Sequence, residues 1–527
     1  MLRPWSRSGR YTGEIDVDVD VAAGHAEQGG WFLRRSTRKR GRLGSMTDEH
    51  LEREDKYDVG ADFSLPDLTL DSVDRIESAS HHLEATYFDT PDAALRRRGI
   101  TLRRRTGGDD EGWHLKLPAE SGRVEMRVES RAAAVPRELS GLLLGLRRGQ
   151  KLVPTVKLST RRNSHVLIGP DEHLLAEVAD DSVHVDATGD AAGITDWREV
   201  EVELGTAGTA DLLTVLGGRL RLAGAQPSPS VSKSARALGD APADTRRRRL
   251  AGLVDDYLQA QYTAILDGDV ALRRELNVVH RTRVAVRRWR STVRTFDELF
   301  EPEASRRLET ELVWFAALLG QVRDLDILRD RLTGRLAALP GEFVVGPVAA
   351  RLESTLAAER ATAYQRLRRA MNGKRYLALL ELLEQWRVDP PFTHAAELPK
   401  KKAARYVAKA ETKMLKRLHL ATQPGADNEL LHRARKSEKR FRYACELAQS
   451  VLGKQTQEAI KKAKSLQKLL GEFQDSVVSA AMLRRLGMQA GNAAGENGFT
   501  YGLLLAQEWE TGASTRAQVV HDLLPAV

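Results

Sequence analysis

The chain has 527 residues, enough for two to four domains, and its 82 Lys and Arg against 73 Asp and Glu give a modest net charge of +9. Its single cysteine, Cys445, excludes a disulfide framework and a cysteine-rich metal site. No apolar run approaches the roughly 18 residues of a membrane span and no secretory signal begins the chain, so we expect a soluble cytoplasmic protein without a membrane partner.

Residues 1–45 are polar and basic and show no periodicity. Their densest stretch is 34–42, in which six of nine residues are Arg or Lys. We expect this part to be a disordered basic extension, because it lacks the apolar residues that a core requires. Met46 stands directly before the first patterned segment and is an alternative start.

The next domain is predicted over residues 46–240 and is rich in strands. From about 51 to 205 apolar and polar residues alternate with period two, interrupted by Gly, Pro and Asp turns. The clearest segments are 101–105, 112–117, 123–129 and 197–204. This pattern predicts an antiparallel sheet, with a linker over 241–249.

Each predicted strand carries charge on one face and apolar side chains on the other. The charged faces hold Glu52, Glu54 and Lys56; Arg103 and Arg105; Lys116; Glu177 and Asp181; and Glu199, Glu201 and Glu203. For a single strand, the simplest interpretation is that the charges face water. Several such strands with balanced acids and bases favour a closed sheet, in which the charged faces line a hydrated lumen.

Acids and bases in one lumen are suited to phosphate chemistry. Carboxylates bind hard divalent cations such as Mg²⁺ or Mn²⁺ through oxygen, and Lys and Arg bind phosphate oxygens. Together they favour hydrolysis of a phosphoanhydride bond. His81, His82 and His114 are scattered, and we interpret them as ordinary surface or strand histidines.

From residue 250 to 527 the periodicity is helical, with breaks near 340–341, 390–391 and 424–425. One spacing, His-x2-Arg-x3-basic-x2-Arg, occurs twice. Offsets of three, seven and ten residues fall within roughly 80° on one side of a helix. The two copies are His280, Arg283, Arg287 and Arg290, continued by Arg294, and His432, Arg435, Lys439 and Arg442.

A Leu-Gly-x-x-x-Asp sequence follows each copy, at 319–324 and 470–475. The segment is therefore an internal duplication, with repeats of about 250–390 and 391–527. A solvated surface is the ordinary explanation of one basic helix face, but residues 276–295 contain no acid to offset the repulsion. We predict that both faces bind a polyanion.

Inorganic polyphosphate is the polyanion that we favour. Nucleic acid is a rival partner because it presents a similar phosphate chain, but the basic faces lack interleaved aromatic residues that would stack bases. For His280 and His432 two roles stay open, donation to phosphate and packing at a helix junction.

The β domain resembles the CYTH domain of the triphosphate tunnel metalloenzymes. The resemblance rests on the Glu-x-Glu-x-Lys pattern at 52–56, supported by 86–90, 102–105, 115–116 and 232–233. The duplicated His and Arg helices with their Leu-Gly-x-x-x-Asp sequences resemble the CHAD domain. Together the two resemblances cover nearly everything after residue 46.

The resemblance implies an α+β multidomain protein, with an eight-stranded antiparallel β tunnel followed by tandem four-helix bundles that bind polyphosphate. It implies Mg²⁺ or Mn²⁺ ligands among Glu52, Glu54 and two of Glu199, Glu201 and Glu203, with Asp181 nearby. It implies triphosphate binding by Lys56, Arg103, Arg105, Lys116, Arg162 and Lys233. Arg161 and Arg162 are adjacent, so only one of them can face inward. Arg127 and Glu129 are further residues for the lumen.

The function predicted is metal-dependent hydrolysis of inorganic triphosphate or of polyphosphate ends, in the cytoplasm and in association with polyphosphate granules. Alternatives are a non-catalytic polyphosphate scaffold and a triphosphatase for an organic substrate such as thiamine triphosphate. An adenylate cyclase is a further option, but no feature of the sequence is dedicated to adenosine. No Gly-x4-Gly-Lys-Ser/Thr sequence is present, which argues against a P-loop nucleotidase.

Overall fold

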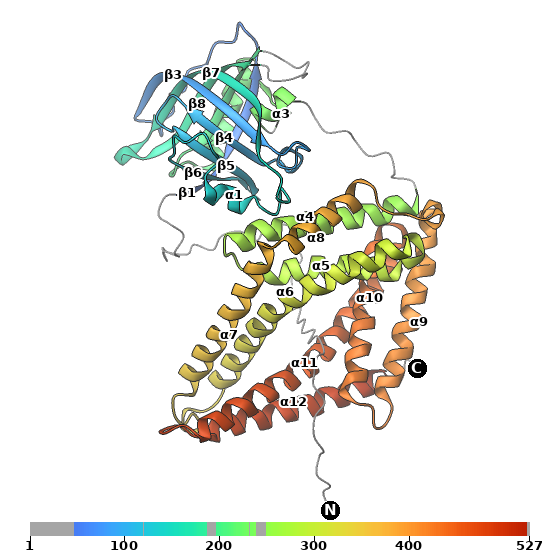
Figure 1. Ribbon diagram of the computed structural model, residues 1–527. Helices are drawn as coiled ribbons and strands as arrows, with labels where there is room; N and C mark the ends of the chain where they lie inside the picture. Colours follow the sequence, from blue (N-terminus) through green and yellow to red (C-terminus); the bar gives the residue numbers. More distant parts are fainter. Residues whose placement is uncertain (1–46, 120, 187–195, 231, 239–248, 524–527) are drawn as a thin grey trace, which may run out of the picture. The chain divides into compact units, whose positions relative to one another are not determined.

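The computed structural model describes residues 47–119, 121–186, 196–230, 232–238 and 249–523 (Figure 1). The described residues form two compact units, an antiparallel β unit and an all-helical unit, which confirms the predicted fold class. The predicted extension 1–45 and all but Arg249 of the predicted linker 241–249 lie outside the described residues.

The β unit is built on one sheet of ten antiparallel strands. The strands are β1 (Thr47–Glu52), β2 (Glu54–Val59), β3 (Arg75–Asp89), β4 (Thr101–Thr106), β5 (Gly112–Ala119), β6 (Gly122–Val128), β7 (Val153–Ile168), β8 (Leu174–Asp186), β9 (Asp196–Leu204) and β10 (Gln226–Pro227). Their spatial order is β1-β6-β5-β4-β3-β7-β8-β9-β2-β10. Three short helices accompany the sheet: α1 (Arg137–Leu142), α2 (Ala210–Leu222) and α3 (Lys233–Leu238).

The prediction of a closed eight-stranded tunnel was wrong in its strand count and in its closure. The first predicted strand is divided at Arg53: its first part pairs with β6 and its second part with β9. The two-residue β10 then adds to β2. Pairing therefore leaves β1 and β10 as the end strands, and the two sides of the sheet are joined by the covalent chain that runs from β1 through Arg53 into β2.

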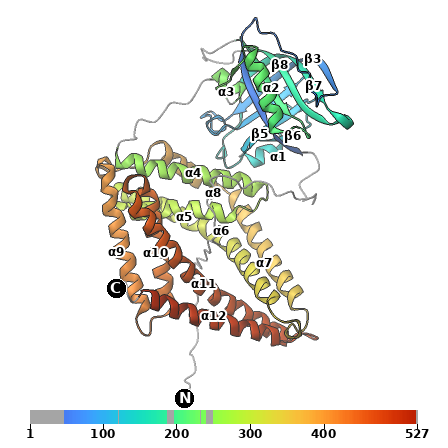
Figure 2. The same ribbon diagram turned by 180° about the vertical axis from the view of Figure 1, so that it is seen from behind.

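The outer surface of β2, β8 and β9 is apolar and is covered by a helix. Figure 2 shows α2 lying over these strands. Leu212, Leu216 and Leu220 of α2 pack against Val200 and Val202 of β9 in one buried cluster. Because successive side chains of a strand point to opposite faces, this packing turns the charged residues of β9 to the inner face.

The helical unit consists of nine α-helices within 249–523. The first repeat supplies α4 (Leu250–Arg273), α5 (Val279–Thr295), α6 (Pro302–Ala337), α7 (Val348–Met371) and α8 (Lys374–Val388). The second supplies α9 (Ala403–Thr422), α10 (Asn428–Leu452), α11 (Lys454–Gly491) and α12 (Phe499–Leu523). None of these described helices is both long enough and apolar enough to cross a membrane.

The two repeats are not separate four-helix bundles, which corrects the prediction. The first repeat has five described α-helices, and one hydrophobic cluster joins both repeats. It contains Leu332 of α6, Leu352 of α7, Leu483 of α11 and Leu504 of α12. At about 1.5 Å per residue, α6 and α11 are each roughly 55 Å long, and their C-terminal halves bury apolar side chains with α7 and α12 in this cluster.

The backbones of β1 and β6 approach each other closely at Gly122, where a side chain would not fit. Gly122 has φ of +127°, and a Cβ atom there would lie 2.0 Å from the carbonyl oxygen of Glu52. We expect Gly122→Ala to destabilise this contact by about 1–3 kcal/mol from backbone strain, with the steric clash adding to it. Hydrogen exchange of peptides from 47–128 in the full chain measures the effect.

Gly141→Ala is the matched control, since an added Cβ meets no atom within 4 Å and Gly141 lies in the helix α1. The control should change protection by less than about 1 kcal/mol, because alanine favours a helix over glycine. Equal protection in both variants would contradict the role assigned to Gly122.

Candidate functional site

The charged faces of the strands converge on one cavity of about 730 Å³ inside the β unit. Of the twelve residues predicted for this site, the following ten line it: Glu52, Glu54, Lys56, Arg103, Arg105, Lys116, Arg162, Glu201, Glu203 and Lys233. The other two, Asp181 and Glu199, are buried and form ion pairs with Lys233. The structure thus brings all twelve together, while their individual roles stay predictions.

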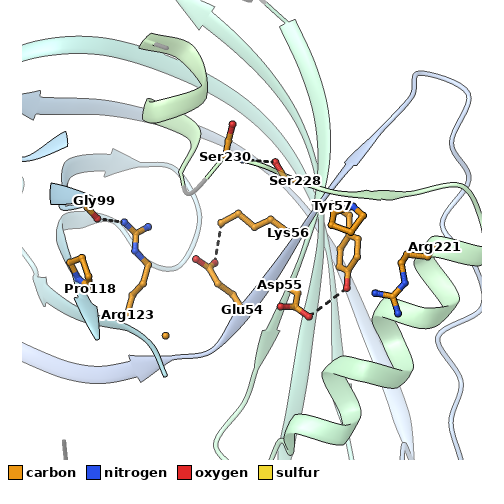
Figure 3. Close-up of a pocket in the computed structure, with 12 residues that line it drawn as sticks. Glu54, Asp55, Lys56, Tyr57, Gly99, Pro118, Arg123, Arg221, Ser228 and Ser230 are labelled. Atoms are coloured by element: carbon orange, nitrogen blue, oxygen red, sulfur yellow. Dashed lines mark hydrogen bonds and ion pairs between the residues drawn. The ribbon is translucent and has the colours of Figure 1, made fainter. Parts of the chain in front are cut away.

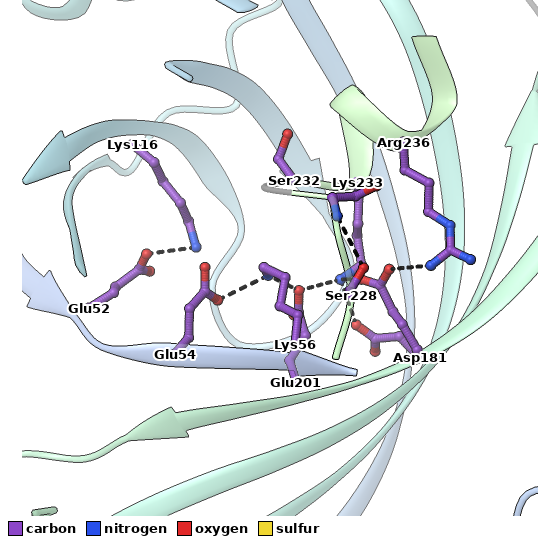
Figure 4. A network of polar contacts seen from close by, with 12 residues as sticks. Glu52, Glu54, Lys56, Lys116, Asp181, Glu201, Ser228, Ser232, Lys233 and Arg236 are labelled. Atoms are coloured by element: carbon purple, nitrogen blue, oxygen red, sulfur yellow. Dashed lines mark hydrogen bonds and ion pairs between the residues drawn. The ribbon is translucent and has the colours of Figure 1, made fainter. Parts of the chain in front are cut away.

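Lys233 is the centre of the first network of ion pairs (Figure 4). Its Nζ atom lies 3.0 Å from Asp181, 2.5 Å from Glu199 and 2.7 Å from Glu201. Burial alone would lower the pKa of Lys233, but these carboxylates raise it above its ordinary value. The ammonium is therefore charged, and in this structure it is the cation shared by the three acids.

The Glu-x-Glu-x-Lys strand joins the same network. Lys56 donates to Glu54 at 3.1 Å and to Glu201. Burial alone would raise the pKa of Glu54 and of Glu201, but the nearby ammonium groups lower both. These two carboxylates are consequently ionised at neutral pH.

The pairing of β7 with β8 decides which of Arg161 and Arg162 faces the cavity. Arg162 donates to Asp181 at 2.8 and 2.6 Å and to Glu201 at 2.9 Å, whereas Arg161 is exposed on the opposite face. Arg127 also lines the cavity, but Glu129 is exposed and does not.

Arginines gather on β4. Burial, together with repulsion from Arg103 and Arg162, lowers the pKa of Arg105 to about 10. The Nε atoms of Arg103 and Arg105 are buried and have no hydrogen-bond partner among the described residues. Cations that repel one another and donors that lack acceptors are features of a site for an anion.

Acids outnumber bases around the start of the Glu-x-Glu-x-Lys strand. Lys116 contacts Glu52 at 2.8 Å, but burial and the neighbouring Glu125 and Glu203 raise the pKa of Glu52 to about 7. Burial, with Glu54 and Glu125, also raises the pKa of Glu203. A further cation at this position would stabilise these carboxylates.

Glu125 of β6 was missed by the sequence analysis. It is fully buried, and it accepts from Arg127 at 2.5 Å and pairs with His114 at 2.9 Å. The alternation of residues 123–129 placed it on the same face as Arg127, which was signal enough to find it. His114 is a buried histidine of β5, and its second nitrogen lies 2.8 Å from the carbonyl oxygen of Asp110.

A second cavity, of about 580 Å³, adjoins the first at the same strand. Figure 3 shows Glu54 and Lys56 on its wall, with Arg123 and the serines Ser228 and Ser230 around it. Glu54, Lys56 and Arg123 line both cavities. The paired charges of the Glu-x-Glu-x-Lys strand therefore stand where the two spaces meet.

Two groups of side chains have the geometry to hold a metal ion. One consists of Asp181, Glu199 and Glu201, and the other of His50, Glu52 and Glu203; in each, the ligand atoms lie within 4.8 Å of one another. Oxygen-rich sets of this kind suit Mg²⁺ and Mn²⁺. The predicted ligand Glu54 belongs to neither group and pairs with Lys56 instead.

In the helical unit the two basic faces approach each other. Arg288 of α5 and Arg442 of α10 both contact Glu446, at 2.9 and 3.2 Å, and both lie over the ring of Tyr443. The predicted stripe residues Arg283, Arg287, Arg435, Lys439 and Arg442 are buried, whereas Arg290 and Arg294 lie further out and contact Glu309. His280 and His432 are half-buried, and both roles proposed for them stay open.

A buried acid lies among these cations. Glu438 is fully buried, and neither carboxylate oxygen has a hydrogen-bond partner among the described residues. Burial raises its pKa to about 7, opposed by Arg442, Lys439, Arg435 and Arg287. These four neighbours come from both repeats, so α5 and α10 form a single cationic region.

The aspartates of the repeated Leu-Gly-x-x-x-Asp sequences belong to the same region. Asp324 lies 3.7 Å from Arg283. Burial raises the pKa of Asp475 to about 6, against the opposing charge of Arg435. The duplication thus supplies one acid to each basic face.

Comparison with known proteins agrees with this division. The CYTH domain matches residues 50–237, and the CHAD domain matches residues 256–484. An uncharacterized protein of Mycobacterium tuberculosis, found in strains H37Rv and CDC 1551, is 37% identical over 506 residues, which cover 89% of this chain and 95% of that protein.

Solved structures resemble separate parts of the chain. PptA from Streptomyces chartreusis is 20% identical, with a TM-score of 0.45, over 52% of this chain and 99% of that one. The CHAD domain from the plant Ricinus communis is 26% identical, with a TM-score of 0.42, over 54% and 95%. A putative adenylyl cyclase from Hippeastrum, described as having a dominant triphosphatase activity, is 17% identical, with a TM-score of 0.23, over 35% and 94%.

The raised pKa of Glu52 predicts a pH dependence of metal binding. Below about pH 7 its carboxyl group holds a proton that a metal ion must displace, so affinity should fall as the pH falls. We expect Mg²⁺ to bind the full chain about tenfold more tightly at pH 8 than at pH 6, measured by isothermal titration calorimetry.

Glu52→Gln should weaken binding and reduce this dependence, because the amide does not titrate. Glu129→Gln is the control, because Glu129 is an exposed acid directly after the end of β6; this variant should behave like the unmodified protein. An affinity that is equal at both pH values would contradict the prediction.

Proposed function

This chain belongs to the proteins in which a CYTH domain is followed by a CHAD domain, and we propose on that premise that its β unit hydrolyses inorganic triphosphate or the ends of polyphosphate with the help of Mg²⁺ or Mn²⁺. The observation that carries the proposal is the single cavity of about 730 Å³ in which acids and bases meet. A cavity for phosphoryl transfer needs cations for the phosphates and carboxylates for a metal ion.

The cationic side chains of the cavity have different roles in the proposed binding of phosphate. Arg103 and Arg105 have buried nitrogens that lack acceptors, so they are suited to donate to non-bridging phosphate oxygens. Lys56 is held by carboxylates, which fix its ammonium at the junction of the two cavities. Positive charge fixed before the substrate arrives stabilises the charge that develops on the phosphates during hydrolysis.

A divalent cation, when bound, would neutralise part of the substrate charge and lower the pKa of an attacking water. The acids available to hold it are those of the two groups described above, Glu52 and Glu203 with His50, and Asp181 with Glu199 and Glu201. Their oxygen donors fit a hard cation.

We assign the helical unit to the binding of polyphosphate. Buried arginines and lysines from both repeats converge there, and they exceed the nearby acids. A long polyanion that lay along α5 and α10 would offset the repulsion between these cations. Competition between polyphosphate and single-stranded RNA at fixed salt distinguishes this partner from nucleic acid.

One observation favours a second candidate, a polyphosphate scaffold without catalysis. Lys233 already satisfies all three acids of the Asp181 group, so that group holds a cation without any metal ion. A protein that retains polyphosphate yet releases no phosphate from triphosphate, ATP or thiamine triphosphate, with Mg²⁺ or Mn²⁺, would be this scaffold. The same assay identifies the preferred substrate.

The two adjacent arginines of β7 give a matched test of hydrolysis. Arg162→Ala removes an inward cation and should lower kcat/KM for triphosphate by about a hundredfold or more. Arg161→Ala removes an exposed cation from the other face and should leave it unchanged.

Both variants should still bind polyphosphate through the helical unit, and circular dichroism checks that they fold. Equal turnover by the two variants would refute the assignment of the cavity as the catalytic site. Lys56→Ala and Glu54→Ala should likewise abolish hydrolysis and spare polyphosphate binding.

The raised pKa of Glu438 predicts that polyphosphate binding depends on pH. Above a pH of about 7 its carboxyl group is ionised and repels phosphate, so affinity should fall as the pH rises through 7. Glu438→Gln should bind roughly threefold to tenfold more tightly than the unmodified chain at pH 8, and equally at pH 6.

Glu429→Gln is the control on the same helix, because Glu429 is exposed and its charge lies in solvent. Fluorescence anisotropy with labelled polyphosphate at fixed ionic strength measures all three proteins. A pH dependence that survives in Glu438→Gln would show that another group is responsible.

A further inference from the structure

The two groups of acids in the β unit differ in the ammonium groups that they contact. In the Asp181 group, the ammonium of Lys233 lies within 3.0 Å of all three carboxylates. In the other group, Lys116 reaches only the Oε2 atom of Glu52, and the Oε1 atom faces His50. A metal ion would have to displace an ammonium from the first group, but not from the second.

His50 points a ring nitrogen into the second group. Its Nε2 atom lies 3.6 Å from Oε1 of Glu52 and 3.9 Å from Oε1 of Glu203. It also lies 3.6 Å from Oε2 of Glu125, but that carboxylate is already held by Arg127 and His114. Glu52 and Glu203 are therefore the carboxylates close to the imidazole that neither Arg127 nor His114 contacts.

The fold brings these residues together from opposite sides of the sheet. His50 and Glu52 share one face of β1, and His50 stands opposite Glu125 of β6. Glu203 comes from β9, where it stands opposite Glu54 of β2. The division of the first strand at Arg53 is what places β9 beside the end of β1.

We propose that His50 is a nitrogen ligand for a divalent cation, together with Glu52 and Glu203, and that it makes this site favour Mn²⁺ over Mg²⁺. The inference rests on the proposed function in so far as that function requires a metal ion. Mg²⁺ binds oxygen almost alone, whereas first-row transition metals accept imidazole readily. A site of two carboxylates and one imidazole therefore discriminates between the two cations.

The electrostatics of the group agree with this geometry. Glu52 is almost fully buried, Glu203 is half-buried, and Lys116 is the one ammonium among the described residues that an ion pair joins to either of them. A divalent cation between the two carboxylates would compensate their charge. His50 itself is more than a third exposed, so an ion could reach the imidazole from solvent.

The test is pulsed electron paramagnetic resonance of Mn²⁺ bound to the full chain without substrate. A coordinating imidazole gives nitrogen modulation of the electron spin echo, which carboxylates and water do not. We expect this modulation in the unmodified protein and in His82→Gln, which changes an exposed histidine of β3 outside the cavity. It should vanish in His50→Gln.

His50→Asp keeps the test decisive if the glutamine variant folds poorly. Its carboxylate can still bind a cation but has no nitrogen, so Mn²⁺ should bind without modulation. By calorimetry, His50→Gln should lose about tenfold in Mn²⁺ affinity and should lose less in Mg²⁺ affinity.

Absence of modulation in the unmodified protein, or its persistence in His50→Gln, would overturn the inference. That result would leave hydrolysis of triphosphate with Mg²⁺ untouched. Conversely, a chain that shows the modulation but hydrolyses no phosphoanhydride would keep the metal site and refute the proposed function.

Discussion

Ionised side chains enclosed by a sheet impose the constraint on which the β unit depends. A buried charge is costly unless an opposite charge or a hydrogen bond compensates it. Lys233 compensates three carboxylates at once, and Arg162 compensates two of them a second time. Since strand side chains alternate, the charges that point inward require apolar side chains outward, and α2 covers part of that outer surface.

The charges along the cavity are not compensated equally: some side chains contact a group of opposite charge, and others lie beside groups of the same charge. Near Lys233 every acid has a base. On β4, burial and the neighbouring guanidinium of Arg103 lower the pKa of Arg105. Near Glu52, burial and the neighbouring acids raise the pKa of Glu52 and of Glu203. An anion and a cation would each relieve one of these imbalances. The proposed binding of a phosphate chain and a metal ion is consistent with this distribution of charge.

The helical unit tolerates repulsion of the same kind because its stability comes from elsewhere. Apolar residues of α6, α7, α11 and α12 form one cluster that both repeats share. The helices α5 and α10 contact each other directly, and Arg287 and Arg442 act on the same buried acid, Glu438. The duplication in sequence therefore becomes one cationic region and not two separate ones.

The sequence by itself determined the class of each half, because the periods of strands and helices are local, and it determined which charged residues share a face, because the alternation is strict. The twelve residues that it predicted for the β site are brought together by the structure, but Glu125 of the same site was missed. It did not determine the division of the first strand at Arg53, the inward choice of Arg162 over Arg161, or the sharing of one core by α6 and α11. Those features depend on register and on contacts between residues distant in the chain, as does the approach of His50 to Glu203, and no local pattern contains such contacts.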